Sequence, residues 1–366
     1  MNIKSLLLGS AAALAAVSGA HAADAIVAAE PEPLEYVRIC DAYGAGYFFL
    51  PGTETCLKIG GMVRTEGGWY NAYNPGVGGN RGTYWHTRAQ LSVDTATDTE
   101  YGPLKTNTVY RFDFNDGKAT TTKLLWANIS LGGFTVGKAD SAYNLYVGYA
   151  GDVINDDVIY DGPYELNQIT YNYDAGNGFT AVASVEDSNS SGSDSSSYGA
   201  SWWTDDKTNH YAPDGVLGFG YKTGGFGFKV VGGYDSIVEE GAIKARVDAD
   251  FGAFTAFLMG GYNTDGDKLN KYAGTNLDRS ACPVNDASKC GWGDWAVWGG
   301  GSVPINDKLK WNLQLAYTDS KIFAATTNLK FNPVKNLLIE PELSYTNFDS
   351  VNQDQWAGIL RFERSF

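Results

Sequence analysis

Hydrophobic and polar residues alternate with a period of two in one segment of the chain after another. Between Leu309 and Tyr317, leucine, tryptophan and tyrosine occupy one parity, whereas lysine, asparagine and glutamine occupy the other. Alternation of this kind predicts β-strands with one apolar and one polar face. In the fourth expected strand, Leu125 and Ile129 are placed on the apolar face. The sixteen strands that we expect cover residues 57–64, 85–94, 110–114, 125–131, 134–138, 168–174, 179–186, 215–221, 226–235, 242–249, 254–263, 292–303, 308–319, 321–332, 337–347 and 355–366.

The connections between these strands alternate in length. Tight turns such as 132–133 and 222–225 are interleaved with other connections, several of which are long. The long ones are residues 66–83, 139–167, 187–213 and 264–291. Transmembrane barrels place short turns on the periplasmic side and longer loops outside, and an even strand number returns the chain to its starting side. The pattern favours an all-β fold, a sixteen-stranded antiparallel transmembrane β-barrel.

A soluble β-sandwich or propeller is the alternative, because it too is built from many short two-faced strands. The chain holds 23 tyrosines, 17 phenylalanines and 10 tryptophans, yet its mean hydropathy is −0.25. Strands that are apolar only toward lipid produce this mixture. The last strand alternates up to a terminal aromatic residue, Phe366, which resembles the signal that outer-membrane assembly machinery binds. We therefore expect the membrane barrel.

The N-terminus has the features of a secretory signal peptide. Lys4 precedes an apolar run that ends at Val17, and Ala20 and Ala22 provide a small-residue cleavage site. The run is shorter than the roughly 18 apolar residues that a membrane anchor needs. We expect residues 1–22 to be removed, residues 23–56 to form a lead-in and residues 57–366 to form the barrel.

The chain is acidic, with 42 Asp and Glu residues against 27 Lys and Arg residues and a formal net charge of −15. An acidic chain is a poor partner for nucleic acid. If the polar strand faces line a water-filled lumen, the acidic excess favours cations and neutral solutes over anions.

Several segments resemble the general porin family of alphaproteobacteria, of the rhizobial and Brucella type. They are MNIKSLLLGSAAALAA at the start, YVRICDAYGAGYFFLPGTETCLKI at 36–59, GDVINDDVI at 151–159, and the ending at Phe366. The resemblance implies a homotrimer in the outer membrane, surrounded by lipid and lipopolysaccharide. It also implies passive diffusion of ions and small hydrophilic solutes without a cofactor. A barrel that acts as adhesin, receptor or scaffold is the alternative function.

The resemblance further implies that the third external loop, residues 139–167, folds into the barrel and narrows it. Its acidic residues are expected to line the constriction: Asp140, Asp152, Asp156, Asp157, Asp161 and Glu165. Basic residues of the polar strand faces are expected to lie opposite them: Lys58, Arg64, Arg88, Arg111, Lys244 and Arg246. Acid facing base would create a transverse field across the constriction, and the acidic excess predicts weak cation selectivity.

Four cysteines remain after signal removal, and an exported chain matures where disulfides form. Four cysteines allow three pairings. We expect Cys40 to pair with Cys56, inside the family segment, and Cys282 to pair with Cys290. The spacings lack the close Cys-x-x-Cys pairs of structural zinc sites, so no metal site is expected.

Catalysis is the remaining competing class of function. Hydrolysis by a Ser-His-acid group needs a histidine beside its partners. Only His86 and His210 survive signal removal, and the sequence pattern places no evident partner next to either. We therefore expect no enzymatic activity.

Overall fold

The computed structural model of the chain describes residues 38–71, 82–156, 159–188, 211–276, 286–349 and 352–366. The signal peptide expected at residues 1–22 lies outside these ranges and stays a prediction. In the described ranges, no helix is long and apolar enough to cross a membrane.

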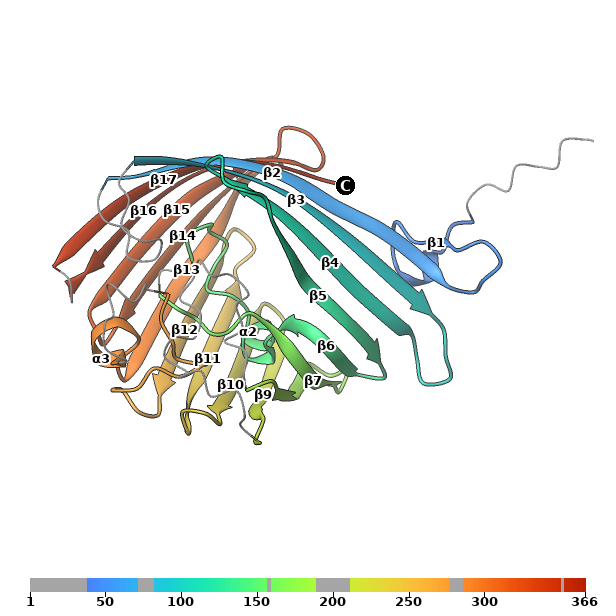
Figure 1. Cartoon of the computed structure of the whole chain (residues 1–366), viewed down its shortest axis with the longest axis horizontal. Coiled ribbons are helices and arrows are strands. Elements are labelled where there is room, and N and C mark those ends of the chain that lie inside the picture. The colour runs from blue at the N-terminus through green and yellow to red at the C-terminus, as the bar shows by residue number, and fades with distance from the viewer. Residues whose placement is uncertain (1–37, 72–81, 157–158, 189–210, 277–285, 350–351) are drawn as a thin grey trace, which may run out of the picture.

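The strands form one closed antiparallel barrel (Figure 1). The sheet has 17 strands, of which β2 to β17 make the barrel and β1 is a two-residue addition. Each barrel strand pairs with the next along the chain, and β17 returns to pair with β2, which closes the sheet. The barrel strands are β2 (Cys56–Tyr70), β3 (Gly82–Thr97), β4 (Leu104–Asn115), β5 (Thr121–Leu131), β6 (Phe134–Asp140), β7 (Glu165–Asp174), β8 (Phe179–Glu186), β9 (Asp214–Thr223), β10 (Phe226–Asp235), β11 (Glu240–Asp250), β12 (Thr255–Asn263), β13 (Trp295–Asn306), β14 (Leu309–Thr318), β15 (Ile322–Phe331), β16 (Leu337–Phe348) and β17 (Gln353–Ser365). The predicted sixteen-stranded barrel is confirmed.

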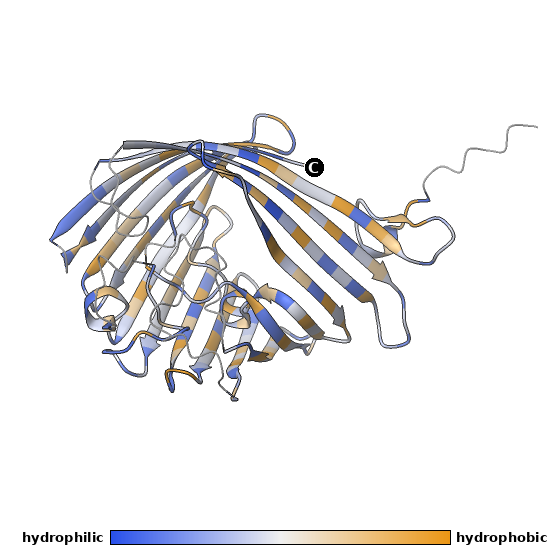
Figure 2. Ribbon diagram, in the orientation of Figure 1, coloured by the Kyte–Doolittle hydropathy of each residue, from blue (hydrophilic) through white to orange (hydrophobic). Residues whose placement is uncertain are grey.

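The two faces of the strands differ as the alternation predicts. On β4, the outward side chains of Tyr110, Phe112 and Phe114 are 43% to 46% exposed. On β14, Asn312 and Gln314 point inward and are buried. Figure 2 shows the resulting bands of apolar and polar residues along β3, β4 and β5. Apolar side chains outside and polar side chains inside are what a barrel in lipid with a wet lumen requires.

Several predicted bounds are wrong, because the strands predicted at 57–64 and 110–114 are longer, as β2 and β4, and the connection predicted at 66–83 is correspondingly shorter. Two further differences have a local structural cause. The pairing of β4 with β5 shifts by one residue, so that β5 carries a bulge. The extra residue turns Leu125 inward, where it is 4% exposed, and leaves Leu124 on the outer face at 40%. The twelfth predicted strand also begins later than expected, at Trp295, because Trp292 lies in the preceding loop and is buried inside the barrel.

The N-terminal segment that precedes the barrel covers an exposed strand edge. It holds the 3-10 turn η1 (Asp41–Tyr43) and β1 (Phe48–Phe49). β17 pairs with β2 only as far as Met62, and β1 pairs with the first two residues of β2 beyond that point. Capping an unpaired edge in this way prevents it from pairing with other chains.

The predicted disulfide between Cys40 and Cys56 is confirmed, and it ties the N-terminal segment to the start of β2. The second predicted pair stays a prediction, because Cys282 lies outside the described residues. Cys290 is itself disulfide-bonded.

Two long external connections fold into the barrel. Loop 3 denotes the described residues between β6 and β7, which are 141–156 and 159–164, and it begins with the short helix α2 (Ala142–Val147), which Figure 1 shows inside the barrel. Its inward course confirms the prediction of a constriction loop. Loop 6 denotes the described residues between β12 and β13, which are 264–276 and 286–294, and it contains α3 (Ala287–Cys290). The inward course of loop 6 is not expected from the sequence.

Candidate functional site

The start of loop 3 is fixed by a buried carboxylate. Glu186 ends β8 and is 1% exposed. It accepts hydrogen bonds from the hydroxyl of Ser141 and the backbone N–H of Ala142, each at 2.9 Å. The Ser141 side chain in turn accepts a hydrogen bond from the N–H of Tyr143, which caps α2. The first turn of the loop is thereby bound to the wall of β8.

Lys244 and Asp161 do not line a water-filled path, and their predicted roles there are wrong. The ammonium of Lys244 donates to Oδ1 of Asn144 at 2.7 Å and to the carbonyl of Asp161 at 2.5 Å. It lies 4.4 Å from the ring centre of Tyr143 and is 0% exposed. Loop 3 covers the lumen face of β11, so a lysine placed there by parity binds the loop instead of facing solute.

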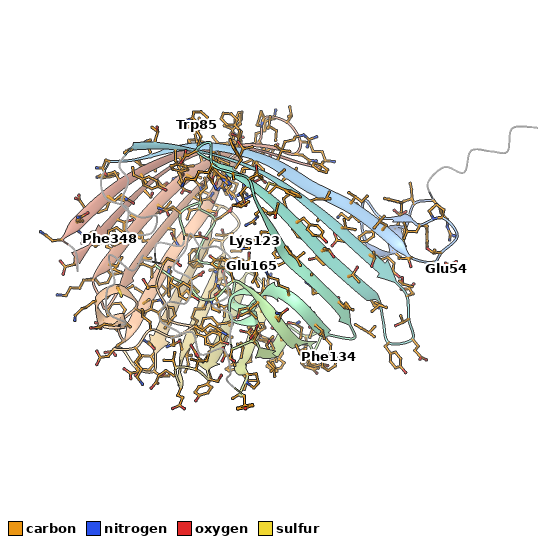
Figure 3. The ribbon with its side chains drawn as sticks, in the orientation of Figure 1. Glu54, Trp85, Lys123, Phe134, Glu165 and Phe348 are labelled. Carbon is orange, nitrogen blue, oxygen red and sulfur yellow. A yellow bond between two sulfur atoms is a disulfide. The ribbon has the colours of Figure 1, made fainter. Side chains whose placement is uncertain are left out.

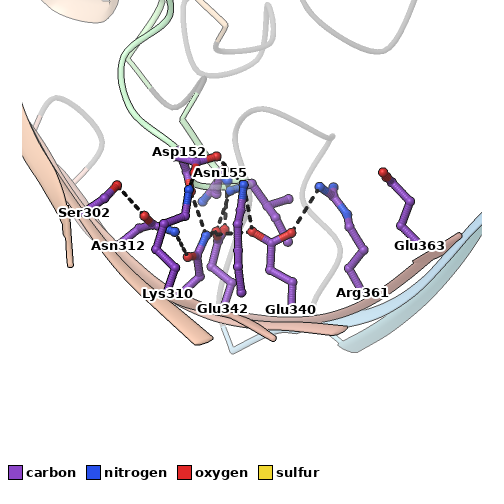
Figure 4. Close-up of polar contacts among 12 residues, drawn as sticks. Asp152, Asn155, Ser302, Lys310, Asn312, Glu340, Glu342, Arg361 and Glu363 are labelled. Atoms are coloured by element: carbon purple, nitrogen blue, oxygen red, sulfur yellow. Dashed lines mark hydrogen bonds and ion pairs between the residues drawn. The ribbon is translucent and has the colours of Figure 1, made fainter. Parts of the chain in front are cut away.

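The tip of loop 3 is pinned to the far wall by Asp152. Its carboxylate pairs with Lys310 on β14 and Lys330 on β15 (Figure 4). Burial by itself raises the pKa of Asp152, but hydrogen bonds from the two lysines outweigh burial and hold that pKa below its ordinary value. Asp152 is therefore ionised at neutral pH, and its charge is compensated.

Backbone contacts hold the rest of the tip. Glu342 on β16 accepts hydrogen bonds from the N–H groups of Ile154 at 2.5 Å and Asn155 at 2.8 Å. Asn328 on β15 donates to the carbonyl of Asp152 at 3.0 Å. A loop bonded at both its start and its tip crosses the lumen in one fixed position.

From Asp152 and its two lysine partners, a belt of charged residues continues around the lumen wall. Glu340 on β16 lies 3.8 Å from Arg361 on β17, and Arg361 bonds to Glu66 on β2 at 2.7 Å. His86 on β3 connects Glu66 to Asp113 on β4. We call the following residues the charged belt: Arg64, Glu66, His86, Arg88, Arg111, Asp113, Lys123, Glu165, Lys310, Lys330, Glu340, Glu342, Arg361 and Glu363.

Half of the predicted basic residues of the wall, namely Arg64, Arg88 and Arg246, are paired with carboxylates. Arg64 bonds to Glu363 at 2.6 Å, and Arg88 bonds to Asp113 at 2.6 Å. Arg111 is different, because it contacts only the amide oxygen of Gln90 at 3.4 Å and forms no ion pair within the described part of the chain.

The remaining predicted basic residues lie elsewhere. Lys58 is near the periplasmic end of β2, 5.7 Å from the ring centre of Tyr47, away from the loop. Arg246 on β11 pairs with Asp248 at 2.8 Å and donates to the carbonyl of Tyr149 at 2.5 Å. Arg246 thus supports the periplasmic side of loop 3.

The other predicted acidic residues also differ from one another in their surroundings. Asp140 accepts a hydrogen bond from the indole N–H of Trp126 at 2.9 Å, and Glu165 pairs with Lys123 at 3.1 Å, as Figure 3 lets the reader follow. Asp156 is half-buried, and Asp157 lies outside the described residues. Because these contacts tie carboxylates to the wall, the described part of the constriction is not an array of free acids facing free bases.

His86 lies between two carboxylates, which the sequence pattern does not place beside it. Its Nδ1 lies 2.9 Å from Glu66, and its Nε2 lies 2.7 Å from Asp113. Both ring nitrogens are therefore occupied by carboxylates, and neither is available to activate a nucleophile, as a general base would have to. His210 lies outside the described residues.

The partners that hold the constriction loop and balance its charges are not among the predicted site residues. They are Lys310, Lys330, Glu340, Glu342, Arg361, Glu363, Glu66, Asp113 and Lys123. The alternation along the strands that places Arg64 and Arg88 in the lumen could have identified these partners. Applied to the last four strands, the same parity places Lys310 and Arg361 there too.

On the periplasmic side of loop 3 the lumen is open. A cavity of about 850 Å³ lies between the loop and the walls of β7 to β13, and periplasmic turn residues such as Gly178 and Gly225 border it. Polar side chains contribute to its lining, among them Asn172, Lys229 and Ser302. An open chamber therefore follows the constriction.

Comparisons with known proteins agree with this architecture. A family model for the porin subfamily matches residues 24–361. The chain is 42% identical to porin Omp2b of Brucella neotomae and 43% identical to porin Omp2b of Brucella canis, with 100% of each chain covered.

Solved structures share the fold. The channel DcaP of Acinetobacter baumannii superposes with a TM-score of 0.63 at 16% identity, covering 87% of this chain and 99% of that one. The anion-selective porin of Comamonas acidovorans gives 0.58 at 13% identity, covering 86% and 100%. The closed barrel, the loop bonded across its lumen and the match along the whole chain lead to one conclusion: this chain belongs to the porin subfamily of outer-membrane channel proteins.

Proposed function

We propose that this porin is a general diffusion channel for ions and small hydrophilic solutes, with weak cation selectivity. The observation that carries the proposal is loop 3, which lies across a closed barrel and is bonded to the wall at Glu186 and at Asp152. A fixed polar constriction selects by size and charge without binding any one solute tightly. Solutes enter between the external loops, pass the charged belt and leave through the periplasmic chamber down their gradient.

The charge distribution supports a weak preference. In the charged belt most cations lie beside carboxylates, so neither sign dominates at the narrowest part. The formal net charge of −15 for the whole chain favours cations at the mouths. Because the charges at the constriction are compensated and acidic residues are in excess elsewhere, we expect a weak selectivity for cations.

We further propose that the channel works as a homotrimer in a bilayer containing lipopolysaccharide. Residues 1–22 would direct export, and the last strand with Phe366 would be bound by the assembly machinery. Large apolar side chains on the outer faces of β2 to β5, such as Trp85, Leu91 and Ile129, provide the kind of surface that subunits can bury. In this scheme, residues 23–56 are a lead-in and residues 57–366 are the pore domain.

The test is planar-bilayer conductance of the purified, refolded protein, with the reversal potential read under a tenfold salt gradient. We expect large, long-lived openings that close in thirds and a reversal potential displaced toward that of the cation. A displacement toward the anion would overturn the proposed selectivity. A folded protein without conductance would overturn the channel and favour an adhesin or a scaffold.

A further inference from the structure

Loop 6 is packed inside the barrel and touches loop 3 directly. The hydroxyl of Tyr160 in loop 3 donates to the carbonyl of Lys271 at 2.7 Å, and the indole N–H of Trp292 donates to the carbonyl of Tyr160 at 2.5 Å. The rings of Tyr272 and Tyr143 lie 5.0 Å apart, and both are fully buried. Loop 3 is therefore held by a second loop as well as by the wall.

A buried ion pair anchors loop 6 at this point. The ammonium of Lys271 pairs with the carboxylate of Asp214 at the start of β9, and both side chains are 0% exposed. The N–H of Lys271 also donates to Asp235 at the end of β10, at 2.8 Å. Removing one partner of such a pair leaves the other charged and buried, which is strongly unfavourable.

The same carboxylate that fixes loop 3 also binds loop 6. Glu186 accepts a hydrogen bond from the hydroxyl of Tyr272 at 3.0 Å while it holds Ser141 and Ala142 at the start of α2. The Glu186 carboxylate therefore couples the position of loop 6 to the position of loop 3. Because this carboxylate is buried, it has few alternative partners.

Two glycines make room for the aromatic side chains of loop 6. A Cβ atom at Gly233 on β10 would lie 2.5 Å from the ring of Tyr272. A Cβ atom at Gly261 on β12 would lie 2.5 Å from the ring of Trp292. Side chains at these lumen positions would push the loop off the wall, so the wall itself is shaped to receive it.

Apolar residues complete a packed core inside the lumen. Val216, Val231 and Met259 belong to the lumen faces of β9, β10 and β12, yet they are buried in one hydrophobic cluster with Tyr143, Tyr272 and Trp292 of the two loops. A lumen wall that faced only water would carry polar residues at these positions.

We propose that loop 6 is a positioning element of the constriction, with Lys271 and Tyr272 as its positioning residues. It fills the external half of the lumen beside β8 to β12 and clamps loop 3, so that solute passes only along the charged belt. This inference rests on the diffusion function proposed above and adds the part that sets the size of the aperture and keeps it from fluctuating.

The test compares Lys271→Met with the wild type in single-channel recordings and in liposome swelling with sugars of increasing size. Folding of each variant is checked by the heat-sensitive migration of the barrel in detergent gels. We expect brief closures at least tenfold more often and faster swelling with the larger sugars. Lys268→Met is the matched control, because Lys268 lies in the same loop but is 49% exposed and pairs only with surface carboxylates.

The double variant Lys271→Met with Asp214→Asn removes both buried charges and is expected to return the closure frequency part of the way toward wild type. If Lys271→Met yields no folded barrel, Tyr272→Phe decides, and about threefold more closures are expected from it. A folded Lys271→Met barrel with wild-type closures and size limit overturns the inference. A wild-type protein that does not conduct overturns the proposed function instead.

Discussion

At the scale of single residues, Arg111 differs from the other arginines of the charged belt because it forms no ion pair with a carboxylate in the described part of the chain. A fixed positive charge in the lumen repels cations over roughly 8 Å at physiological salt. Arg111→Gln should therefore raise the ratio of cation to anion permeability, by about twofold, without changing the fold.

The measurement is the reversal potential under a salt gradient, and the control is Arg364→Gln. Arg364 is on the outward parity of β17 near the periplasmic end, so its loss removes the same charge outside the lumen. Equal shifts in the two variants would mean that net charge, and not the position of Arg111, determines selectivity.

Asp152 gives the constriction its acid sensitivity. Its pKa in the folded protein is below the ordinary value, so the contacts of Asp152 with the two lysines stabilise loop 3 from neutral pH down to that ordinary value, about 3.9. The stabilisation is lost only as the pH falls further, through the lower folded-state pKa. We therefore expect the single-channel current noise to increase as the pH falls below about 4.

Asp152→Asn should reproduce the low-pH noise at pH 7, because the amide cannot form the two ion pairs. Since Asp152 is 41% exposed, the loss is modest, roughly 1 kcal/mol. Asp248→Asn is the matched control, because it removes a lumen carboxylate that pairs with Arg246 and leaves the loop tip bonded. Quiet current in Asp152→Asn at pH 7 would show that the backbone contacts alone hold the tip.

At the scale of elements, alternation predicts the strands well because most strands carry an apolar outer face and a polar lumen face. β8 (Phe179–Glu186) and β10 (Phe226–Asp235) begin and end at the predicted residues. The prediction fails at Leu125 because a bulge changes parity locally, and a bulge leaves no mark in the hydrophobic pattern.

The constriction is harder to predict for a related reason. Parity alone places Lys244 in the lumen, but whether a lumen side chain meets water depends on which loop lies over it. Loop 6 could have been suspected from Val231 and Met259, which are apolar at lumen positions, and from Tyr272 and Trp292 in the loop. Such long-range packing is not encoded in any short sequence window.

The N-terminal element supplies a prediction about the disulfide. β1 contributes only two pairs to the sheet, so the Cys40–Cys56 bond is the main tie of the segment before β2. Closing a loop of this length stabilises it by about 3 kcal/mol. In the variant Cys40→Ser with Cys56→Ser, we expect proteolysis within residues 41–55 and unchanged conductance. A drop in conductance would place this segment in the permeation path.

At the scale of the whole molecule, the two halves of the lumen differ in what occupies them. On the external side, beside β8 to β12, it is filled by loops 3 and 6 around buried aromatic side chains, whereas beside β14 to β17 and β2 to β4 it carries the charged belt. The filled half provides rigidity, and the charged half provides the route for solute. The sign of selectivity must then arise from charges outside the compensated belt, at the two mouths.

That arrangement has a consequence for the response to salt. Charges at the mouths act on ions through water, and their reach falls from about 30 Å at 0.01 M salt to about 3 Å at 1 M. If the acidic excess at the mouths determines the preference for cations, the permeability ratio should be largest in dilute salt and approach that of free diffusion near 1 M. Reversal potentials at a constant tenfold gradient, centred on successively higher salt, measure this directly. A ratio that stays constant over the whole range would mean that ions are selected in contact with the belt itself, and Arg111→Gln would then have to change the ratio at every salt concentration.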